Sequence, residues 1–383
     1  MIVGGGLAGA KAAETLREEG FAGRVVLIGA EPELPYERPP LSKGYLIGSA
    51  EREEARVHPR AFYDEHEIEL LTGVAATALD TVEHRLALAD GQELTYDRLL
   101  LATGAVPRRP PLPGIDLDGV HTLRTLPDSD ALRQAFARRG TVVVIGAGWI
   151  GCEVAAAAHS HGAEVVLVGR GDTPLHAVLG PELGGWFGDV HRRHGVRVIT
   201  GAAVEGIDGD GSVSAVRLAG GEAIACDTVV VGVGVAPDTR LGEAAGLAVD
   251  NGIAVDEQLR TSAPDVFAAG DVANAFHPHY GRHVRVEHWA NALHQGPAAA
   301  RSMLGGDVAY DRLPYFFSDQ YDVGMEYIGL HSPTDTVEVR GSLDDEDFRV
   351  LWHDGDGRVT AGMHVNQWDT IEEIEGLIRA EVR

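Results

Sequence analysis

The chain has 383 residues, which is too long for one ordinary domain and typical of two or three. Its formal net charge of −26 argues against nonspecific binding to nucleic acid, because such binding needs Lys and Arg against phosphate. There is no apolar run of about 18 residues and no leader with a cleavage site, so we expect no membrane span and a cytoplasmic protein. The only cysteines, Cys152 and Cys226, are far apart, which excludes a disulfide framework and a CxxC redox pair.

The first predicted element in chain order is a β-α-β unit, and this unit occurs twice. Residues 3–29 run from a short apolar strand through a glycine turn and an alanine-rich helix to a second apolar strand. Residues 145–169 repeat this order, at a distance from the first copy that is too long for a solenoid repeat. The repeat therefore predicts two Rossmann-type nucleotide-binding domains.

Each unit contains a G-x-G-x-x-G turn that suits a dinucleotide. In the first turn, Gly4 allows the tight bend, Gly6 lets the backbone approach a pyrophosphate, and Gly9 lets the helix pack on the strand. The pyrophosphate would lie at the positive end of the helix. One such motif is a weak signal, but two copies, each between a strand and a helix, are strong evidence. The predicted contacts at the two turns are Gly4, Gly6, Leu7, Ala8, Gly9, Gly146, Gly148, Ile150 and Gly151.

The residues that end each unit bear on which dinucleotide binds. NAD sites usually carry Asp or Glu here for the ribose 2′-hydroxyl, whereas the second unit has Gly169 followed by Arg170. An Arg suits a 2′-phosphate, so we expect NADPH rather than NADH, with a solvated loop Arg as the alternative reading. In the first unit Ala30 fills this slot, and Glu31 either holds the cofactor ribose or is an ordinary loop carboxylate.

Strand signals and Pro-rich segments indicate that the first domain is interrupted by the second. Apolar strands are predicted at residues 92–103 and 228–235, and residues 105–114 read as a crossing linker. Beyond residue 310, strand-like runs and a helix over 370–380 follow. We therefore predict an α/β protein with two Rossmann-type three-layer domains and a C-terminal α+β domain. The predicted bounds are 1–106 with 235–309 for the first domain, 107–234 for the second and 310–383 for the third.

Two further segments could approach a cofactor. Asp271, which follows Gly270 after an apolar strand, could accept a hydrogen bond from a ribityl hydroxyl, although Gly-Asp alone usually marks a turn. The small residues Ala102, Thr103 and Gly104 permit close approach of a cofactor, or only packing of a strand on a loop. The histidines and cysteines show no metal-ligand spacing, so no metal is expected.

The stretch PYERPPLSK at residues 35–43, together with residues 286–296 and 314–322, resembles the FAD-dependent ferredoxin reductases of bacterial oxygenase systems, and the likeness covers essentially the whole chain. This resemblance implies FAD at the first glycine turn and NADPH or NADH at the second. It implies catalytic roles for Lys43 beside the flavin ring, Glu153 facing Lys43 near the nicotinamide, and Trp289 against the ring. Such a Lys–Glu pair would stabilise negative charge on reduced flavin. Without the resemblance, Glu153 would be a helix residue facing solvent. The other implied cofactor contacts are Arg38, Val74, Ala102, Thr103, Gly104, Arg124, Gly234, Gly270 and Asp271.

The resemblance also implies a small iron–sulfur ferredoxin as electron acceptor and partner. Disulfide reductases of the wider superfamily carry paired cysteines beside the flavin, whereas residues 41–48 hold none, so the flavin would pass electrons on directly. An acidic ferredoxin would need a basic rim. One alternative is an NAD(P)H oxidase or a quinone or radical reductase of the same fold, and another is a regulatory flavoprotein like the apoptosis-inducing factors. We expect a monomer or a weak homodimer. The candidate rim residues are Arg282, Arg285, Arg301 and Arg312.

Overall fold

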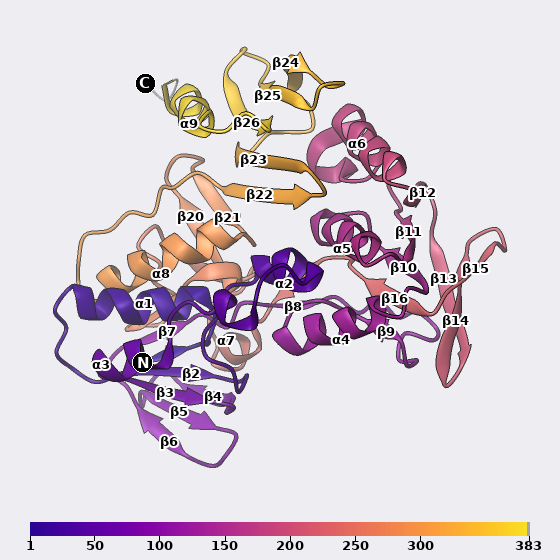
Figure 1. Ribbon diagram of the computed structural model, residues 1–383. Helices are drawn as coiled ribbons and strands as arrows, with labels where there is room; N and C mark the ends of the chain where they lie inside the picture. The colour runs from indigo at the N-terminus through magenta and orange to yellow at the C-terminus, as the bar shows by residue number, and fades with distance from the viewer. Residues whose placement is uncertain (381–383) are drawn as a thin grey trace.

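The computed structural model describes residues 1–380 and arranges them in three units (Figure 1). Two units are built on parallel sheets and the third on an antiparallel sheet, which confirms the predicted fold class. The last three residues of the predicted third domain lie outside the described residues. Within residues 1–380, no helix is both long and apolar enough to cross a membrane.

The first unit is a five-stranded parallel sheet whose strands are almost wholly buried. Its order puts the two-residue strand β1 at the centre, between β7 and β2, so the first glycine turn leaves the middle of the sheet. Strands buried on both faces are expected for a parallel sheet that has layers on both sides. In spatial order the strands are β19 (Val266–Ala268), β7 (Leu99–Leu101), β1 (Ile2–Val3), β2 (Val25–Gly29) and β3 (Ile68–Thr72).

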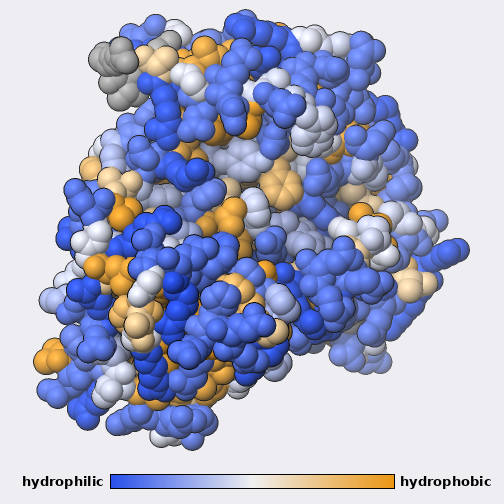
Figure 2. Space-filling model, turned by 60° about the vertical axis from the view of Figure 1, so that its left-hand side comes forward, coloured by the Kyte–Doolittle hydropathy of each residue, from blue (hydrophilic) through white to orange (hydrophobic). Residues whose placement is uncertain are grey.

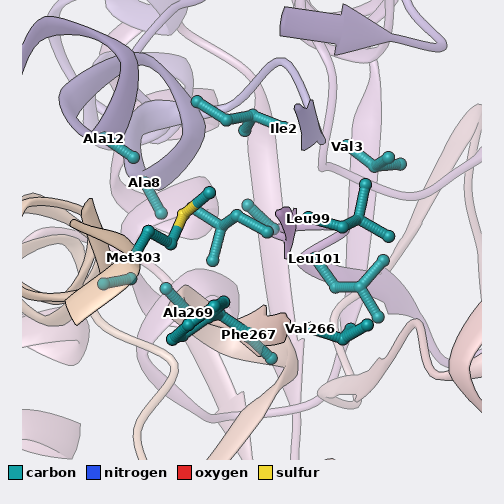
Figure 3. Close-up of a cluster of buried hydrophobic side chains, with 14 of the residues drawn as sticks. Ile2, Val3, Ala8, Ala12, Leu99, Leu101, Val266, Phe267, Ala269 and Met303 are labelled. Carbon is teal, nitrogen blue, oxygen red and sulfur yellow. The ribbon is translucent and has the colours of Figure 1, made fainter. Parts of the chain in front are cut away.

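Helices α1 (Leu7–Glu18) and α8 (Trp289–Met303) lie side by side on one face of this sheet (Figure 1). They approach to backbone contact, because a Cβ atom on Gly296 would lie 2.3 Å from the carbonyl oxygen of Ala8. Figure 3 shows Ala8, Ala12 and Met303 facing the strands across a purely apolar core. The other face is covered by the meander of β4 (Ala76–Asp80), β5 (Arg85–Leu88) and β6 (Glu93–Thr95).

The second unit repeats this design. Alternate residues of β10 serve its two layers: Val142 and Val144 face the helices, while Val143 and Ile145 face an antiparallel meander. The helices are α4 (Leu126–Phe136), α5 (Trp149–Ser160) and α6 (His176–Arg193), and the meander is β13 (Val204–Asp210), β14 (Ser212–Leu218) and β15 (Ala223–Ala225). The parallel strands in spatial order are β12 (Arg197–Ile199), β11 (Glu164–Val168), β10 (Thr141–Ile145), β16 (Thr228–Val231) and β9 (Val120–His121).

The two strands predicted at 92–103 and 228–235 are each divided in the structure. The first becomes β6 and β7, which belong to different sheets. The second becomes β16 and β17 (Val235–Pro237), because the chain turns at Gly234 with φ +97°. Strand β17 pairs with β8 (Ala105–Pro107), so the outgoing and returning chains run together between the two parallel sheets. The bounds 1–106 with 235–309, 107–234 and 310–383 stay a prediction.

The third unit is an antiparallel sheet with a different layer on each face. Helix α9 (Ile371–Ala380), which begins one residue later than predicted, covers one face through Ile374 and Ile378. The opposite face packs on α6 of the second unit, where Trp186 and Phe187 contact the sheet's core residues. The strand-like runs predicted beyond residue 310 are confirmed as strands. In spatial order the strands are β22 (Tyr315–Gln320), β23 (Val323–Gly329), β26 (Val359–Val365), β25 (Asp347–His353) and β24 (Thr336–Ser342).

The remaining elements are short. They lie before the first unit's strand β3 or between β17 and α8 along the chain. They are α2 (Gly44–Ile47), α3 (Arg60–Glu65), α7 (Arg240–Ala244), β18 (Ile253–Val255), β20 (Ala273–His277) and β21 (Arg282–Arg285).

A buried histidine between the second and third units makes stability depend on pH. His191 is fully buried, and its Nδ1 lies 2.9 Å from the hydroxyl of Tyr321. Burial lowers the pKa of His191 from 6.5 to about 4. The unfolded chain therefore takes up a proton at higher pH than the folded chain does, and stability is lost as the pH falls from 6.5 to 4. We expect this histidine to remove up to roughly 3 kcal/mol over that window.

Urea denaturation across this pH range, with wild type and His191→Gln compared, measures the effect. The variant should have the flatter dependence, because the titrating group is gone. If the free energy of unfolding depended on pH in the same way in both proteins, His191 would not be the cause of the pH dependence.

Candidate functional site

A cavity of about 1090 Å³ opens where the three units meet, and both glycine turns face it. Pockets for small ligands reach about 1,000 Å³, so this space suits a large ligand or two ligands together. Figure 2 shows apolar and pale residues in a recess at the centre of a mostly hydrophilic face. Most of the predicted site residues line the cavity: Gly4, Gly6, Leu7, Ala8, Glu31, Arg38, Lys43, Val74, Ala102, Thr103, Gly104, Arg124, Gly148, Ile150, Gly151, Glu153, Gly234, Gly270, Asp271 and Trp289.

The glycines of each turn fall into two kinds. Gly4 has φ +128°, and a Cβ atom there would lie 2.0 Å from the carbonyl oxygen of Ala102. Gly6, by contrast, has an ordinary φ of −92°, and a Cβ atom there would meet no atom of residues 1–380 within 4 Å apart from its own chain neighbours. In the second turn Gly146 and Gly148 repeat this contrast. The protein itself therefore requires glycine at the first position of each turn, while the third position keeps space open in the cavity.

Three predicted contacts lie outside the cavity lining. Gly9 acts in packing, since a Cβ atom there would lie 2.1 Å from the carbonyl oxygen of Gly4. Gly146 packs in the same way against Gly232. Arg170 is exposed and away from the cavity. At the preceding Gly169, a Cβ atom would lie 2.9 Å from the Cβ atom of Ala147. The glycine turn therefore occupies the space that a side chain at this position would need.

Lys43 and Glu153 meet across the cavity from different units. Lys43 lies between the short helical turn at Pro39–Ser42 and α2, and Glu153 lies in α5 directly after the second glycine turn. The Lys43 ammonium donates to Glu153 at 2.7 Å, and the side chains are 15% and 3% exposed. Glu153 therefore does not face solvent, and the pair is a nearly desolvated ion pair at the junction of the two glycine turns.

The carboxylate of Glu153 has two further donors. The Ser42 hydroxyl donates to Oε2 at 2.5 Å, and the Ser318 hydroxyl, from β22, donates to Oε1 at 2.8 Å. A buried carboxylate needs such donors to offset the loss of water. Neither serine was predicted as a site residue, although both lie in stretches that carry the family resemblance.

Trp289 begins α8 at the edge of the cavity, close to Lys43. Its indole N–H donates to Glu37 at 3.0 Å, and its ring stands perpendicular to that of Phe317 at a centroid distance of 6.0 Å. The Lys43 ammonium lies 5.1 Å from the Phe317 ring centroid, within the range of a cation–π contact. Phe317, which the sequence reasoning missed, thus completes an aromatic wall beside the ion pair.

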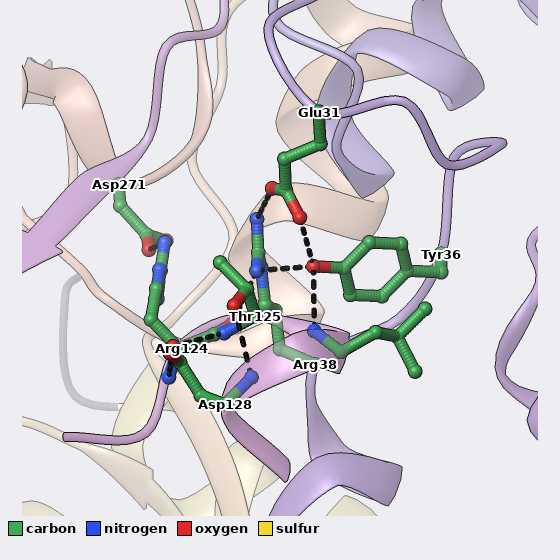
Figure 4. A network of polar contacts seen from close by, with 8 residues as sticks. Glu31, Tyr36, Arg38, Arg124, Thr125, Asp128 and Asp271 are labelled. Atoms are coloured by element: carbon green, nitrogen blue, oxygen red, sulfur yellow. Dashed lines mark hydrogen bonds and ion pairs between the residues drawn. The ribbon is translucent and has the colours of Figure 1, made fainter. Parts of the chain in front are cut away.

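A polar network lines the part of the cavity near the first glycine turn (Figure 4). Glu31 accepts from the Tyr36 hydroxyl at 2.5 Å and from Arg38 at 3.0 Å, so its carboxylate is held in place at the cavity. Arg124 donates to Asp271 at 2.8 Å, while the buried Nε of Arg124 has no protein partner within the described residues. An unsatisfied guanidinium N–H that lines a cavity fits an anionic or oxygen-rich ligand.

Two of the four arginines expected on a basic rim are engaged elsewhere. Arg285 is only 10% exposed, pairs with Glu287 and donates to the carbonyl of Asp271, so its assignment to an exposed rim is wrong. Arg301 pairs with Glu19 at the end of α1. Arg282 and Arg312 are exposed.

Both cysteines are buried, and burial raises the pKa of each thiol, in Cys226 to about 11. Since the thiolate is the reactive form, neither should react in the native protein. We expect iodoacetamide at neutral pH to leave the folded protein unmodified and to label both cysteines after denaturation. Mass spectrometry distinguishes the two cases, and rapid labelling of the native protein would contradict the prediction.

Known proteins resemble this chain over nearly its whole length. A family profile described as pyridine nucleotide-disulphide oxidoreductase matches residues 1–296, and one described as reductase C-terminal matches residues 315–383. Rhodocoxin reductase of Rhodococcus erythropolis is 41% identical over 352 residues, which are 92% of this chain and 82% of the relative.

Two further similarities extend over almost the whole chain. The "Anthranilate 1,2-dioxygenase system ferredoxin--NAD(+) reductase component" of Burkholderia cepacia is 40% identical over 384 residues, or 99% of this chain and 94% of the relative. The crystal structure of the covalent putidaredoxin reductase-putidaredoxin complex contains a chain that superposes with a TM-score of 0.95 at 37% identity, covering 98% of this chain and 92% of that one. The chain therefore belongs to the pyridine nucleotide-disulphide oxidoreductase family and is an oxidoreductase with that family's reductase C-terminal domain.

Proposed function

We propose that this protein is an FAD-dependent NADH:ferredoxin reductase of the cytoplasm. The observation that carries the proposal is the Lys43–Glu153 pair, which spans one cavity between two glycine turns of the Rossmann type. A hydride donor and a hydride acceptor must lie within about 3.5 Å of each other, so two dinucleotide sites that open into one space suit hydride transfer.

The residues around the first turn fit FAD. Helix α1 has no side-chain cap, so its first N–H groups are available to a pyrophosphate beside Gly6. Asp271 offers a carboxylate to ribityl hydroxyls, and Arg124 offers its unpartnered N–H. When bound, FAD accepts two electrons together as a hydride and releases them one at a time. Lys43 would place its ammonium group where the flavin becomes negative, and Glu153 would keep that ammonium group oriented.

NADH suits the second turn better than NADPH, which corrects the expectation drawn from Arg170. The name of the anthranilate relative specifies NAD(+). Arg170 is exposed and not among the cavity-lining residues, which supports the reading of a solvated loop arginine. Position 169 carries no acidic side chain because a side chain there would clash with Ala147.

A ferredoxin is the acceptor that the relatives' names indicate, and the cysteine positions support direct transfer from the flavin. Neither Cys152 nor Cys226 lines the cavity, so no thiol pair can take electrons from a flavin there. The remaining exposed rim arginines, Arg282 and Arg312, are candidates for contact with an acidic partner.

Steady-state cytochrome c reduction with FAD-loaded protein tests the proposal. NADH or NADPH is the donor, and a panel of [2Fe–2S] ferredoxins is added or omitted. We expect reduction that depends on a ferredoxin and a kcat/KM at least tenfold higher for NADH. Fast oxygen or quinone consumption without any ferredoxin dependence would instead identify an oxidase or quinone reductase.

A further inference from the structure

We propose that Ser318 of the C-terminal unit is a positioning residue for hydride transfer, and that it acts through the Lys43–Glu153 pair. This inference rests on the proposed function and deepens it. It would give the third unit a part in a reaction whose two glycine turns belong to the other two units.

Ser318 is placed for this role by the alternation of side chains along β22. The sheet face that carries Ser318 is the face that packs on the second unit, and helix α5 of that unit carries Glu153. Ser318 is 1% exposed, and its hydroxyl donates to Glu153 Oε1 at 2.8 Å. The neighbouring Phe317 lies against Lys43 on the other side of the strand. One strand of the third unit therefore contacts both members of the pair.

The direction of the Ser318 hydroxyl is itself fixed. Gln320 is 1% exposed, and its amide N–H donates to the Ser318 oxygen at 3.2 Å. Because the Ser318 oxygen accepts from Gln320 through one lone pair, its own hydrogen is available to donate to Glu153. Farther along the same interface, the Oε1 atom of Gln320 and the Nε2 atom of His191 are buried and have no hydrogen-bond partner among residues 1–380. Ser318 therefore lies at one end of a group of buried polar side chains that also contains Gln320 and His191, and not beside an open cavity.

Donors from two different units therefore hold the two oxygens of the Glu153 carboxylate. Ser42 of the first unit holds Oε2, and Ser318 of the third unit holds Oε1, which also accepts from Lys43. Without Ser318 the carboxylate of Glu153 can rotate, and the Lys43 ammonium loses its fixed place. A misplacement of about 1 Å can cost up to 100-fold in rate, so a single supporting donor matters.

The first test compares the rate of flavin reduction by NADH in anaerobic stopped-flow experiments. Ser318→Ala should slow reduction about 10-fold, the usual size for a hydrogen bond to a charged group, with less than a twofold change in the half-saturating NADH concentration. Ser318→Cys fills the space of the serine side chain, but its thiol is a weak hydrogen-bond donor. This variant should therefore show the same loss of rate without leaving a cavity. Ser302→Ala, at a buried serine of α8 away from Glu153, is the matched control and should stay within twofold of wild type.

The second test asks whether the effect passes through Glu153. In a Glu153→Gln background, adding Ser318→Ala should change the reduction rate less than twofold. The negatively charged group to which Ser318 donates is already absent from that background. The apoprotein gives a readout that does not depend on activity: the Tm shifts of Ser318→Ala and Glu153→Gln should be non-additive.

Rates for Ser318→Ala and Ser318→Cys within twofold of wild type would overturn the inference. An equal loss in both backgrounds would overturn it as well, because it would mean that the serine acts only in packing. These outcomes leave the proposed function standing, whereas a wild-type flavin that NADH does not reduce would overturn the proposed function itself.

Discussion

Replacing Gly6 by alanine is expected to weaken FAD binding roughly 10- to 100-fold without destabilising the apoprotein. The backbone at Gly6 suits any residue, and a Cβ atom there meets no atom of residues 1–380 within 4 Å apart from its own chain neighbours. A methyl group would therefore crowd only the ligand, and crowding of a close contact costs about 1–3 kcal/mol. In the unfolded chain alanine is less flexible than glycine, so the apoprotein should be as stable as wild type or slightly more so. Flavin fluorescence quenching measures the affinity, and thermal unfolding of the apoprotein measures the stability.

The second glycine turn supplies the matched control. Gly148 has the same open surroundings, so Gly148→Ala should raise the KM for NADH and leave FAD affinity unchanged. Gly4→Ala should behave differently from both, with loss of apoprotein stability by more than about 3 kcal/mol, since its Cβ atom would overlap the backbone of Ala102. If Gly6→Ala affected NADH and Gly148→Ala affected FAD, the assignment of the two turns would be reversed.

Lys43→Ala should slow the reduction of bound flavin by NADH on the order of 100-fold, the usual cost of removing one preorganised donor from a charge that develops in the transition state. The substitution also leaves Glu153 buried without its counter-charge, at 3% exposure, so we expect a loss of stability of about 3 kcal/mol. Stopped-flow absorbance of the flavin gives the rate, and urea denaturation gives the stability.

Lys11→Ala is the natural control, since the chain has only these two lysines. Lys11 lies in α1 of the same unit, pairs with Glu14 and does not line the cavity. Its replacement should leave the reduction rate within twofold of wild type. Equal rates for Lys43→Ala and wild type would remove the Lys43–Glu153 pair from the reaction.

The parts of the fold that local pattern encodes were predictable from the sequence. The two glycine turns, the alanine-rich helices and the alternating strands of the third unit each follow a local pattern of residue types. Such patterns depend only on interactions between residues that are close in the sequence. Lys43 and Glu153 could be paired only through the family resemblance, because they lie 110 positions apart and nothing in the local sequence signals their contact. Glu31 was left open by the sequence, and its place in the cavity depends on Tyr36 and Arg38, whose hydroxyl and guanidinium reach it only after folding.

The errors came from contacts between distant segments. Strands that read as continuous at 92–103 and 228–235 are divided because the chain changes sheets, which apolar runs do not reveal. Arg285 reads as a surface residue until Glu287 and the carbonyl of Asp271 bury its charge. The role inferred for Ser318 depends on a strand from the third unit reaching a helix of the second, a contact that no sequence period encodes.

One anaerobic measurement tests the central claim most directly. Protein reduced with one equivalent of NADH is mixed with two equivalents of an oxidised [2Fe–2S] ferredoxin, and flavin and iron–sulfur absorbance are followed together. We expect the flavin to be reoxidised as two ferredoxins are reduced per NADH, with net release of one proton. A flavin that stays reduced in the presence of every ferredoxin tried, yet is reoxidised at once by oxygen or a quinone, would contradict it.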